Sequence, residues 1–222
     1  MCGRFAQTAS PETIAEQFAL AEPLSLVPRY NIAPSQPVAT VRLNRDTRQR
    51  ELVLFHWGLI PSWAKDPAIG YKMINARSET VTEKPSFRNA FKYRRCLVPA
   101  TGFYEWQKVE KGKQPYYIQV QDGLPFAIAG LWEHWQSADG SEIESVTLLT
   151  TAANEMMRPL HDRMPVIIHP DDYGLWLDPD ETKPEPLLPL LRPFATELMS
   201  AYPVSTLVNS PFNDLPACTL PA

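Results

Sequence analysis

The residue best suited to chemistry in this sequence is Cys2, which follows Met1 and precedes Gly3. Cys2 is small enough for ordinary removal of an initiator methionine, which would leave a terminal cysteine with a free α-amine. The α-amine has an ordinary pKa near ~8 and the thiol one near ~8.5, so both react in part at neutral pH. An aldehyde suits this pair, because the amine condenses to an imine and the adjacent thiol closes a thiazolidine ring at high effective molarity. The alternative is a terminal residue without a function.

Three further side chains could transfer or orient protons around such an aldehyde. Asn75 offers an uncharged donor and acceptor that could orient an amine without protonating it, or it could cap a turn. Glu105 lies among three aromatic residues of a strand-like stretch, and an apolar setting raises a carboxyl pKa toward the range of a proton shuttle. Pairing with Lys108 or Lys113 is the alternative for Glu105. His161 could donate a proton, or it could hold a loop by hydrogen bonds.

Composition restricts the classes of protein to which the chain can belong. Its 222 residues are 44% hydrophobic and 21% charged, which is ordinary for a folded protein with a sizeable core. No apolar run approaches the ~20 residues that span a bilayer, and the start lacks a signal-peptide pattern. The cysteines (Cys2, Cys96, Cys218) are odd in number and far apart, so neither a disulfide framework nor a metal site is expected. We expect a cytoplasmic protein without a metal, a cofactor or a membrane partner.

Charge is distributed unevenly along the chain, although the net charge is only −4. Residues 63–95 carry eight basic and three acidic side chains, whereas residues 171–185 carry six acidic side chains and one lysine. A basic stretch can hold a short anionic strand locally even when the whole protein is acidic. Solvated surface charge is the alternative reading of the same pattern.

Local signals predict short elements joined by many turns, as the 23 prolines require. Ser10 and Pro11 predict the start of a helix that ends near Leu20, with Ile14 and Phe18 on its buried side. The remaining elements are expected by range. Strands are predicted at 38–43, 52–57, 95–100, 103–108, 115–121, 126–135, 144–150 and 165–168, and helices at 85–93, 154–158, 171–177 and 186–191.

Turn signals between the strands from 95 to 150 favour an antiparallel meander. In the predicted helix at 85–93, Phe87 and Phe91 are spaced to share a buried face. Residues 57–63 must form a loop, because Gly58 and Pro61 interrupt any regular element. We therefore predict an α+β protein, a single domain over residues 1–222, with a curved, mostly antiparallel, barrel-like sheet and short peripheral helices.

Six separated motifs, in this order, resemble the SOS response-associated peptidase (SRAP) family, the abasic-site processing proteins. They are Met-Cys-Gly-Arg-Phe at 1–5, Tyr-Asn-Ile-Ala-Pro at 30–34, the tryptophan loop at 57–63, Ile-Asn-Ala-Arg-Ser-Glu at 74–79, residues 99–106 and Leu-His-Asp-Arg-Met-Pro at 160–165. The resemblance runs from Cys2 to about Asn209. It implies one domain of that family's fold, binding to single-stranded DNA, and a covalent link to abasic sites through Cys2. It also suggests roles for Asn75, Glu105 and His161 around that cysteine.

The resemblance gives the arginines and tryptophans near these motifs a second meaning. Arg77 and Arg163, and Arg4 beside the nucleophile, could hold phosphates, because a guanidinium group binds phosphate oxygens in pairs. Trp63 and Trp106 could stack on unpaired bases, each contact stabilising the complex by about 1–3 kcal/mol. Core packing is the alternative for Trp106. Other basic residues of this stretch are less certain candidates and could be surface charge: Lys84, Arg88, Arg94 and Arg95.

The expected function is a DNA-damage protein of the SOS response type that traps abasic sites in single-stranded DNA. An imine that persists would also allow strand cleavage by β-elimination, a lyase activity, and His161 would protonate the sugar ring oxygen as the aldehyde opens. Two other classes remain open: an amidohydrolase or peptidase that uses a terminal cysteine, including one that removes its own Met1, and a non-covalent single-strand binder. A monomer from a bacterial source is expected.

Overall fold

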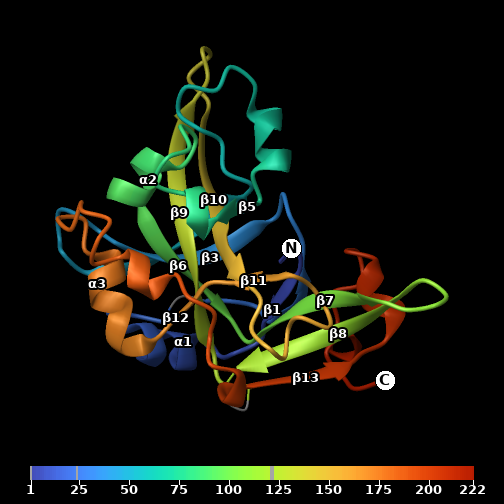
Figure 1. The fold of residues 1–222 in the computed structure, drawn as a ribbon. Helices are drawn as coiled ribbons and strands as arrows, with labels where there is room; N and C mark the ends of the chain where they lie inside the picture. Colours follow the sequence, from blue (N-terminus) through green and yellow to red (C-terminus); the bar gives the residue numbers. More distant parts are fainter. Residues whose placement is uncertain (1, 24, 121–122) are drawn as a thin grey trace.

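The computed structural model describes residues 2–23, 25–120 and 123–222. One sheet, which we call the antiparallel sheet, has the strand order β13-β8-β7-β1-β2, and every neighbouring pair in it is antiparallel. Its strands are β1 (Phe5–Gln7), β2 (Arg29–Ile32), β7 (Gly102–Lys108), β8 (Lys113–Val120) and β13 (Met199–Pro203). In Figure 1 this sheet extends to one side of the molecule, and the α-helices gather on the other.

The second sheet closes on itself. Its strand order is β10-β4-β3-β6-β9, and β9 also pairs with β10, so these strands form a barrel. The barrel strands are β3 (Pro37–Leu43), β4 (Arg50–Trp57), β6 (Arg95–Ala100), β9 (Phe126–Gln136) and β10 (Glu142–Ala152). Only short strands extend it: β5 (Asn75–Arg77), β11 (Arg163–Pro165) and β12 (Ile167–Ile168). The predicted α+β class with a barrel-like, mostly antiparallel sheet is confirmed.

The first helix forms where its capping signal predicts it. In α1 (Pro11–Phe18), the Ser10 side chain accepts a hydrogen bond from the Thr13 N–H, and Ile14 and Phe18 are buried. The second helix, α2 (Arg88–Tyr93), is shorter than predicted, because Phe87 at its start has φ −122° and residues 84–87 form only a turn. Phe87 and Phe91 nevertheless pack in one core cluster, as their spacing predicted.

The rest of the helical structure is short. α3 (Tyr173–Leu177) follows a 3₁₀ turn, η4 (Pro170–Asp172), and together they occupy the predicted range 171–177. The other 3₁₀ turns are η1 (Pro67–Lys72), η2 (Ser78–Thr80), η5 (Leu188–Leu190), η6 (Thr196–Leu198), η7 (Thr206–Asn209) and η8 (Pro216–Cys218). Within the described ranges, no helix is long and apolar enough to cross a membrane.

The predicted meander from 95 to 150 is only partly correct, because β7 pairs with β8 and β9 pairs with β10, whereas β6 does not pair with β7 and β8 does not pair with β9. β6 pairs with β9 in the barrel, whereas β7 and β8 leave the barrel and join the antiparallel sheet. The chain changes sheets at Thr101 and Gly102, where the Thr101 N–H donates to Ala6 O at 2.8 Å. A side chain at Gly102 would lie 2.2 Å from the Tyr117 ring, so the crossing requires glycine. Turn signals do not specify the sheet that a hairpin joins, which is why the sequence misled.

Two smaller predictions also need correction. Residues 154–158 form turns rather than a helix, although the Asn154 side chain accepts the Met157 N–H at 3.0 Å, as the cap at the start of a helix would. Of the helix predicted at 186–191, only η5 forms. The single strand predicted at 165–168 is divided, since β11 pairs with β10 and β12 pairs with β9.

A hydrophobic cluster shared by both sheets lies next to the candidate site, and we call it the shared cluster. It contains Cys2, Phe5 and Phe103 from the antiparallel sheet and its N-terminal approach, and Val98 and Leu148 from the barrel. The other face of the antiparallel sheet packs against the C-terminal segment, residues 204–218, in a separate cluster that includes Tyr104 and Val208. The antiparallel sheet therefore presents one face to the shared cluster and its outer face to the C-terminal segment.

Candidate active site

The position of Glu105 follows from alternation along β7. Successive side chains of a strand point to opposite faces, so Phe103 and Glu105 share one face, and Tyr104 and Trp106 share the other. Phe103 belongs to the shared cluster, and Tyr104 belongs to the cluster on the outer face. Glu105 therefore points toward the shared cluster, which also contains the fully buried Cys2.

The C-terminal half of β10 gathers the second group of candidates. β5 pairs with β10 in parallel, with Asn75 opposite Leu148 and Arg77 opposite Thr150. β11 pairs with β10 in the antiparallel direction, and Arg163 lies opposite Ala152, two residues after Thr150. Residues paired in register share a face, and every second residue returns to it, so these polar side chains lie on the face of Leu148. Leu148 is part of the shared cluster, and so the two groups face a common region.

Asn75 joins the two groups directly. Its Nδ2 donates a hydrogen bond to the Cys2 carbonyl oxygen at 2.8 Å. Its Oδ1 is buried and has no hydrogen-bond partner among the residues that the structure describes. An acceptor without a donor is costly in a protein interior, and this one belongs to the carboxamide that holds the Cys2 backbone. The site therefore holds an acceptor oxygen available to an N–H group near Cys2.

The electrostatics of Cys2 and Glu105 are coupled. Burial raises the pKa of the Cys2 thiol to about 12, and the negative charge of Glu105 adds to that effect. Burial also raises the pKa of Glu105, which is 3% exposed, and the positive charge of His161 partly opposes the rise. The raised pKa that the aromatic neighbours of Glu105 predicted is found, whereas its role as a proton shuttle stays a prediction.

His161 lies in the connection between β10 and β11. Its Nδ1 accepts the Arg163 backbone N–H at 3.0 Å and lies 2.8 Å from the Asp162 carboxylate. Only a protonated Nδ1 could donate to Asp162, but Asp162 is 86% exposed while the Arg163 N–H is held in β11. The backbone bond is therefore the stronger constraint on the neutral ring, whose proton lies on Nε2, whereas the charged ring carries a second proton on Nδ1 that faces Asp162.

The two arginines beside β10 differ in their partners. Arg163 donates from both terminal nitrogens to the Glu79 carboxylate, at 2.5 and 2.9 Å, and also to Thr150 O at 2.6 Å. The Arg77 side chain is exposed. Both lie near Asn75 by register, and their predicted contacts to phosphates remain a prediction.

Arg4 and Trp106 lie on the outer face of the antiparallel sheet, away from Glu105. The Arg4 guanidinium donates to Asn31 Oδ1 at 2.7 Å and Val208 O at 2.8 Å, and it lies 5.7 Å from the centroid of the Trp106 ring. Trp106 Nε1 donates to Asn209 Oδ1 at 2.7 Å. These contacts hold the C-terminal segment, and the structure does not bring either side chain together with Asn75 and Arg163.

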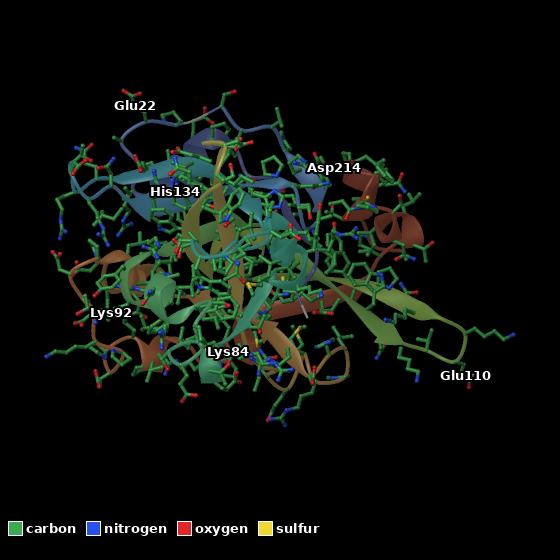
Figure 2. The ribbon with its side chains drawn as sticks, turned by 90° about the horizontal axis from the view of Figure 1, so that it is seen from above. Glu22, Lys84, Lys92, Glu110, His134 and Asp214 are labelled. Atoms are coloured by element: carbon green, nitrogen blue, oxygen red, sulfur yellow. The ribbon has the colours of Figure 1, made fainter. Side chains whose placement is uncertain are left out.

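Asn31 is the polar residue that the sequence analysis missed. It is fully buried, and its Nδ2 lies within hydrogen-bonding distance of the carbonyl oxygens of Val208, Ser210 and Asn213. Beside it, the Asp214 carboxylate accepts the Asn31 N–H at 3.0 Å and also bonds the residues before it in β2. Figure 2 labels Asp214, which belongs to the C-terminal segment. The sequence signal that could have indicated a structural role for Asn31 is its position between Tyr30 and Ile32 in a strand-like stretch.

Trp63 is presented to solvent by a closed loop. The loop base is tight, because Leu59 N–H donates to Met73 O at 3.1 Å and a side chain at Gly58 would lie 2.7 Å from the Gly70 oxygen. Trp63 itself is 59% exposed. The loop prediction for residues 57–63 is correct after Trp57, which ends β4, and base stacking by Trp63 stays a prediction.

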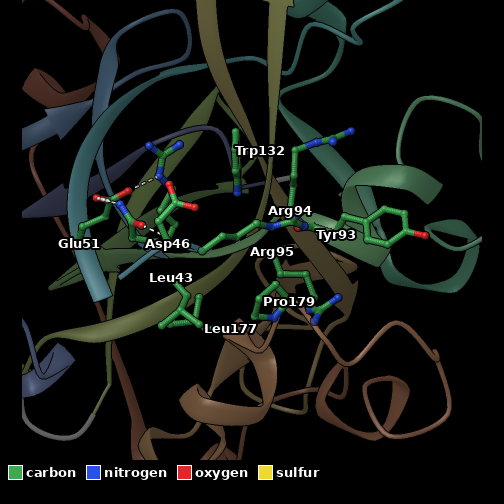
Figure 3. A pocket seen from close by; sticks show the side chains of 12 residues that line it. Leu43, Asp46, Glu51, Tyr93, Arg94, Arg95, Trp132, Leu177 and Pro179 are labelled. Carbon is green, nitrogen blue, oxygen red and sulfur yellow. Dashed lines mark hydrogen bonds and ion pairs between the residues drawn. The ribbon is translucent and has the colours of Figure 1, made fainter. Parts of the chain in front are cut away.

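Arg94 and Arg95, two of the less certain candidates, lie elsewhere and line a pocket of about 300 Å³ on the barrel (Figure 3). In that pocket Glu51 accepts hydrogen bonds from Arg42 and Asn44 at 2.7 and 3.0 Å. Arg94 pairs with Glu133 at 2.7 Å. The buried Arg95 donates to the carbonyl oxygens of Phe91, Lys92, Trp176, Asp178 and Glu181. The donors of Arg95 are therefore engaged by the protein's own backbone.

Among the described residues, no cluster of His, Cys, Asp and Glu could hold a metal ion. The candidate site thus consists of Cys2, Asn75, Glu105 and His161, with Arg77 and Arg163 beside it. Cys2, Asn75 and Glu105 lie at the shared cluster or face it, as their burial and strand register show. His161 is linked to this region through its electrostatic effect on Glu105.

The family model described as "SOS response associated peptidase (SRAP)" matches residues 1–211. The chain belongs to the SRAP family. It is 46% identical over 220 residues to the abasic site processing protein YoqW of Bacillus subtilis, covering 97% of each chain. It is 33% identical to the abasic site processing protein HMCES of Xenopus tropicalis, covering 98% of this chain and 77% of that protein.

A crystal structure of a protein from Bacteroides thetaiotaomicron has the same fold, with a TM-score of 0.89, 30% sequence identity and complete coverage of both chains. Every candidate site residue lies within the part of the chain that the SRAP family model matches. Asp214, which holds the C-terminal segment to β2, lies just beyond it.

Proposed function

We propose that this SRAP family member processes abasic sites in single-stranded DNA by forming a covalent link through Cys2. The names of its relatives support abasic-site processing, and the convergence of separate chain segments on Cys2 supports the chemistry. The observation that carries the proposal is the hydrogen bond from Asn75 to the Cys2 backbone, beside a buried carboxyl group whose charge acts on the Cys2 thiol.

The proposal requires removal of Met1, which leaves the α-amine on Cys2. The buried Asn75 Oδ1 is then a suitable acceptor for an amine N–H, because the same carboxamide already holds the Cys2 carbonyl. An uncharged acceptor orients the amine without adding a proton to it. The lone pair therefore stays available for attack on an aldehyde carbon.

Two proton transfers accompany formation of the imine. His161, as an imidazolium, donates its Nε2 proton to the sugar ring oxygen as the abasic sugar opens to its aldehyde, and the second ring proton stays on Nδ1, which lies 2.8 Å from the Asp162 carboxylate. The Glu105 carboxylate accepts a proton from the attacking amine, and its raised pKa lets it return that proton to the departing hydroxyl. Water leaves, and a carbon–nitrogen double bond remains.

The thiol then adds to the imine carbon. A carbon–sulfur bond forms, the carbon–nitrogen double bond becomes single, and the thiol proton passes to nitrogen, so the thiazolidine ring closes without a co-reactant. The high pKa of the thiol favours this order, because a protonated sulfur does not compete with the amine for the aldehyde. If ring closure is blocked, the imine can instead promote β-elimination and strand cleavage.

Recognition of the strand is proposed for side chains around this centre. Arg77 is exposed two residues from Asn75, and Arg163 lies across β10 from it. Trp63 offers an exposed ring for base stacking. Single-strand binding rather than duplex binding is part of the proposal, since the abasic sugar must reach a site next to a buried cysteine.

The experiment is incubation with single-stranded DNA that contains one abasic site, followed by denaturing electrophoresis. The wild-type protein should leave a heat-stable protein–DNA band. Cys2→Ala keeps an α-amine after Met1 removal but cannot close the ring, so the band should vanish while strand cleavage continues. A stable band from Cys2→Ala without borohydride would falsify the thiazolidine.

The same assay addresses the other classes. A protein with Met1 verified by mass should form no link, because its amine is one residue away from the thiol. An amidohydrolase would release its product without a DNA adduct, and a non-covalent binder would leave no band after denaturation. Release of Met1 by the purified protein itself, followed by mass over time, would establish the peptidase activity that the family name describes.

A further inference from the structure

Glu79 occupies the fork of Arg163. It lies in η2, two residues after the end of β5, and its carboxylate contacts the guanidinium of Arg163 in β11 with bonds of 2.5 and 2.9 Å. The two oxygens of a carboxylate engage a guanidinium in the same paired manner as two oxygens of a phosphate. A DNA phosphate would therefore need the donors that Glu79 holds.

The remaining donors of Arg163 offer no substitute. One terminal nitrogen also donates to Thr150 O, and Nε is buried without a partner among the described residues. The Arg163 side chain is only 14% exposed, whereas that of Glu79 is 49% exposed. Glu79 thus covers the solvent side of Arg163, and its carboxylate can turn into water when another anion takes its place.

We propose that Glu79 is an internal competitor for the strand, whose carboxylate must leave Arg163 before a DNA phosphate binds there. The inference rests on the proposed function, because it assumes that this face receives DNA. It assigns different parts to the two arginines. Arg77 is exposed and free to meet a phosphate at first contact, whereas Arg163 binds only after Glu79 is displaced.

The competition lowers affinity for any strand and speeds its release. Arg163 lies two residues from His161, and its backbone N–H fixes the His161 tautomer. The phosphate that displaces Glu79 would consequently lie next to the reacting sugar. Strands that do not deliver a phosphate to this position leave the Glu79–Arg163 pair closed, so the pair favours correctly seated DNA.

The experiment measures the affinity of an undamaged oligothymidine by fluorescence anisotropy over a range of salt concentrations, so that covalent chemistry does not contribute. Glu79→Gln should bind about 3- to 10-fold more tightly than wild type, the scale of a partly exposed ion pair. Its salt dependence should steepen by about 0.7, since the phosphate at Arg163 is then neutralised without exposing a carboxylate charge in exchange. Glu83→Gln is the matched control, because Glu83 is an exposed acid of the same segment without an ion pair among the described residues.

A double-mutant cycle with Arg163→Gln identifies the partner. The gain in DNA affinity from Glu79→Gln should disappear in the Arg163→Gln background, because the guanidinium with which Glu79 pairs is then absent. An equal gain in that background, or an equal gain from Glu83→Gln, would mean a general charge effect and would overturn the inference. Weaker binding by Glu79→Gln would overturn it too, since a merely structural role predicts that sign.

The variants must be folded for this comparison, which thermal unfolding establishes. Glu79→Asp provides a second measurement, because the shorter side chain weakens the paired contact and should give a smaller gain of the same sign; no gain from it overturns the inference. Failure of the wild-type protein to bind or crosslink DNA would refute the proposed function and the inference with it. Binding by wild type without a gain in Glu79→Gln refutes the inference alone.

Discussion

Two asparagines, Asn31 in β2 of the antiparallel sheet and Asn75 in β5 beside the barrel, show how this protein separates stability from reactivity. On the outer face, Asn31 uses both ends of its carboxamide, accepting from Arg4 and reaching three carbonyl oxygens of the C-terminal segment. Next to the shared cluster, Asn75 uses only Nδ2 and leaves its Oδ1 buried without a partner among the described residues. Satisfied buried groups stabilise a fold, whereas unsatisfied groups and shifted pKa values concentrate where chemistry is done.

Strand β7 contributes side chains to both faces of the antiparallel sheet. Its outward residues, Tyr104 and Trp106, pack on and bond to the segments that close the outer face, and its inward Glu105 carries a raised pKa. The lesson is that a functional carboxyl group and a structural tryptophan can be sequence neighbours and still belong to different regions. The β7–β8 hairpin projects away from both regions, and Glu110 marks its tip (Figure 2).

The largest expected effect comes from Glu105, the proposed proton shuttle in the region next to the shared cluster, which we call the inner region. Glu105→Gln keeps the shape of the side chain but cannot carry a proton, so it should slow crosslinking by a factor of roughly 10²–10⁴. DNA affinity should remain nearly constant. Single-turnover crosslinking rates across pH measure this, with His161→Gln expected to slow the reaction with a different pH profile. Rates for Glu105→Gln that equal wild type at every pH would make Glu105 a structural residue.

Thiol reactivity gives the next largest effect. Because the pKa of Cys2 rises from 9.0 to about 12 in the folded chain, its thiolate fraction at neutral pH should fall by about 10³ relative to the unfolded chain. Alkylation of Cys2 by iodoacetamide, followed by peptide mass mapping in a chain with Met1 verified, should be slower by at least that factor in native protein than in urea. Equal rates in both states would show that the thiol is exposed and its pKa ordinary.

The outer region should respond in stability rather than in rate. Asn31→Ala removes a donor from three carbonyl groups of the C-terminal segment and an acceptor from Arg4, so the free energy of unfolding should fall by about 2–3 kcal/mol. Urea denaturation measures this change. The exposed Asn89 of α2 is the control, since Asn89→Ala should change the free energy of unfolding by no more than about 0.5 kcal/mol.

Asn75→Ala is the matched change in the inner region. It removes one hydrogen bond, so its effect on stability should be only about 1 kcal/mol, while crosslinking slows by about 10² through a misplaced amine. The comparison fails if Asn31→Ala slows crosslinking more than Asn75→Ala does, with both variants folded.

The smallest expected effect is the pH dependence that Glu105 gives to stability. Burial raises its pKa, so the folded protein binds this proton more tightly than the unfolded chain does. The contribution of Glu105 to the free energy of unfolding is therefore largest below the ordinary glutamate range and falls as pH rises through the raised value. Glu105→Gln should gain stability relative to wild type at neutral pH, and the gain should vanish below about pH 4.

Urea denaturation at several pH values measures the difference, and Glu83→Gln controls for the loss of an exposed acidic charge. Parallel stability curves for wild type and Glu105→Gln would mean that the carboxyl group titrates alike in both states. That outcome would remove the electrostatic distinction between the two regions.

Sequence patterns predicted the local elements well and their assembly less well. The capping serine of α1 and the phenylalanine spacing before β6 act over a few residues, so they can be read without a fold. The meander was only partly correct, because pairing partners are chosen by packing between distant strands. The partners of Asn31 and Arg163 were missed for the same reason, since they lie 177 to 182 and 84 residues away along the chain.

The sequence by itself determined the chemical inventory: a cysteine next to the initiator methionine, a carboxyl group among aromatic residues, an asparagine, a histidine and several arginines. Its motifs also identified the family. Only the tertiary structure decided which of these meet. Register between β5, β10 and β11 brings Asn75 to Cys2, and alternation along β7 turns Glu105 inward and Trp106 outward. Burial, which shifts the pKa values of Cys2 and Glu105, is a property of packed neighbours and exists only once the two sheets have closed on each other.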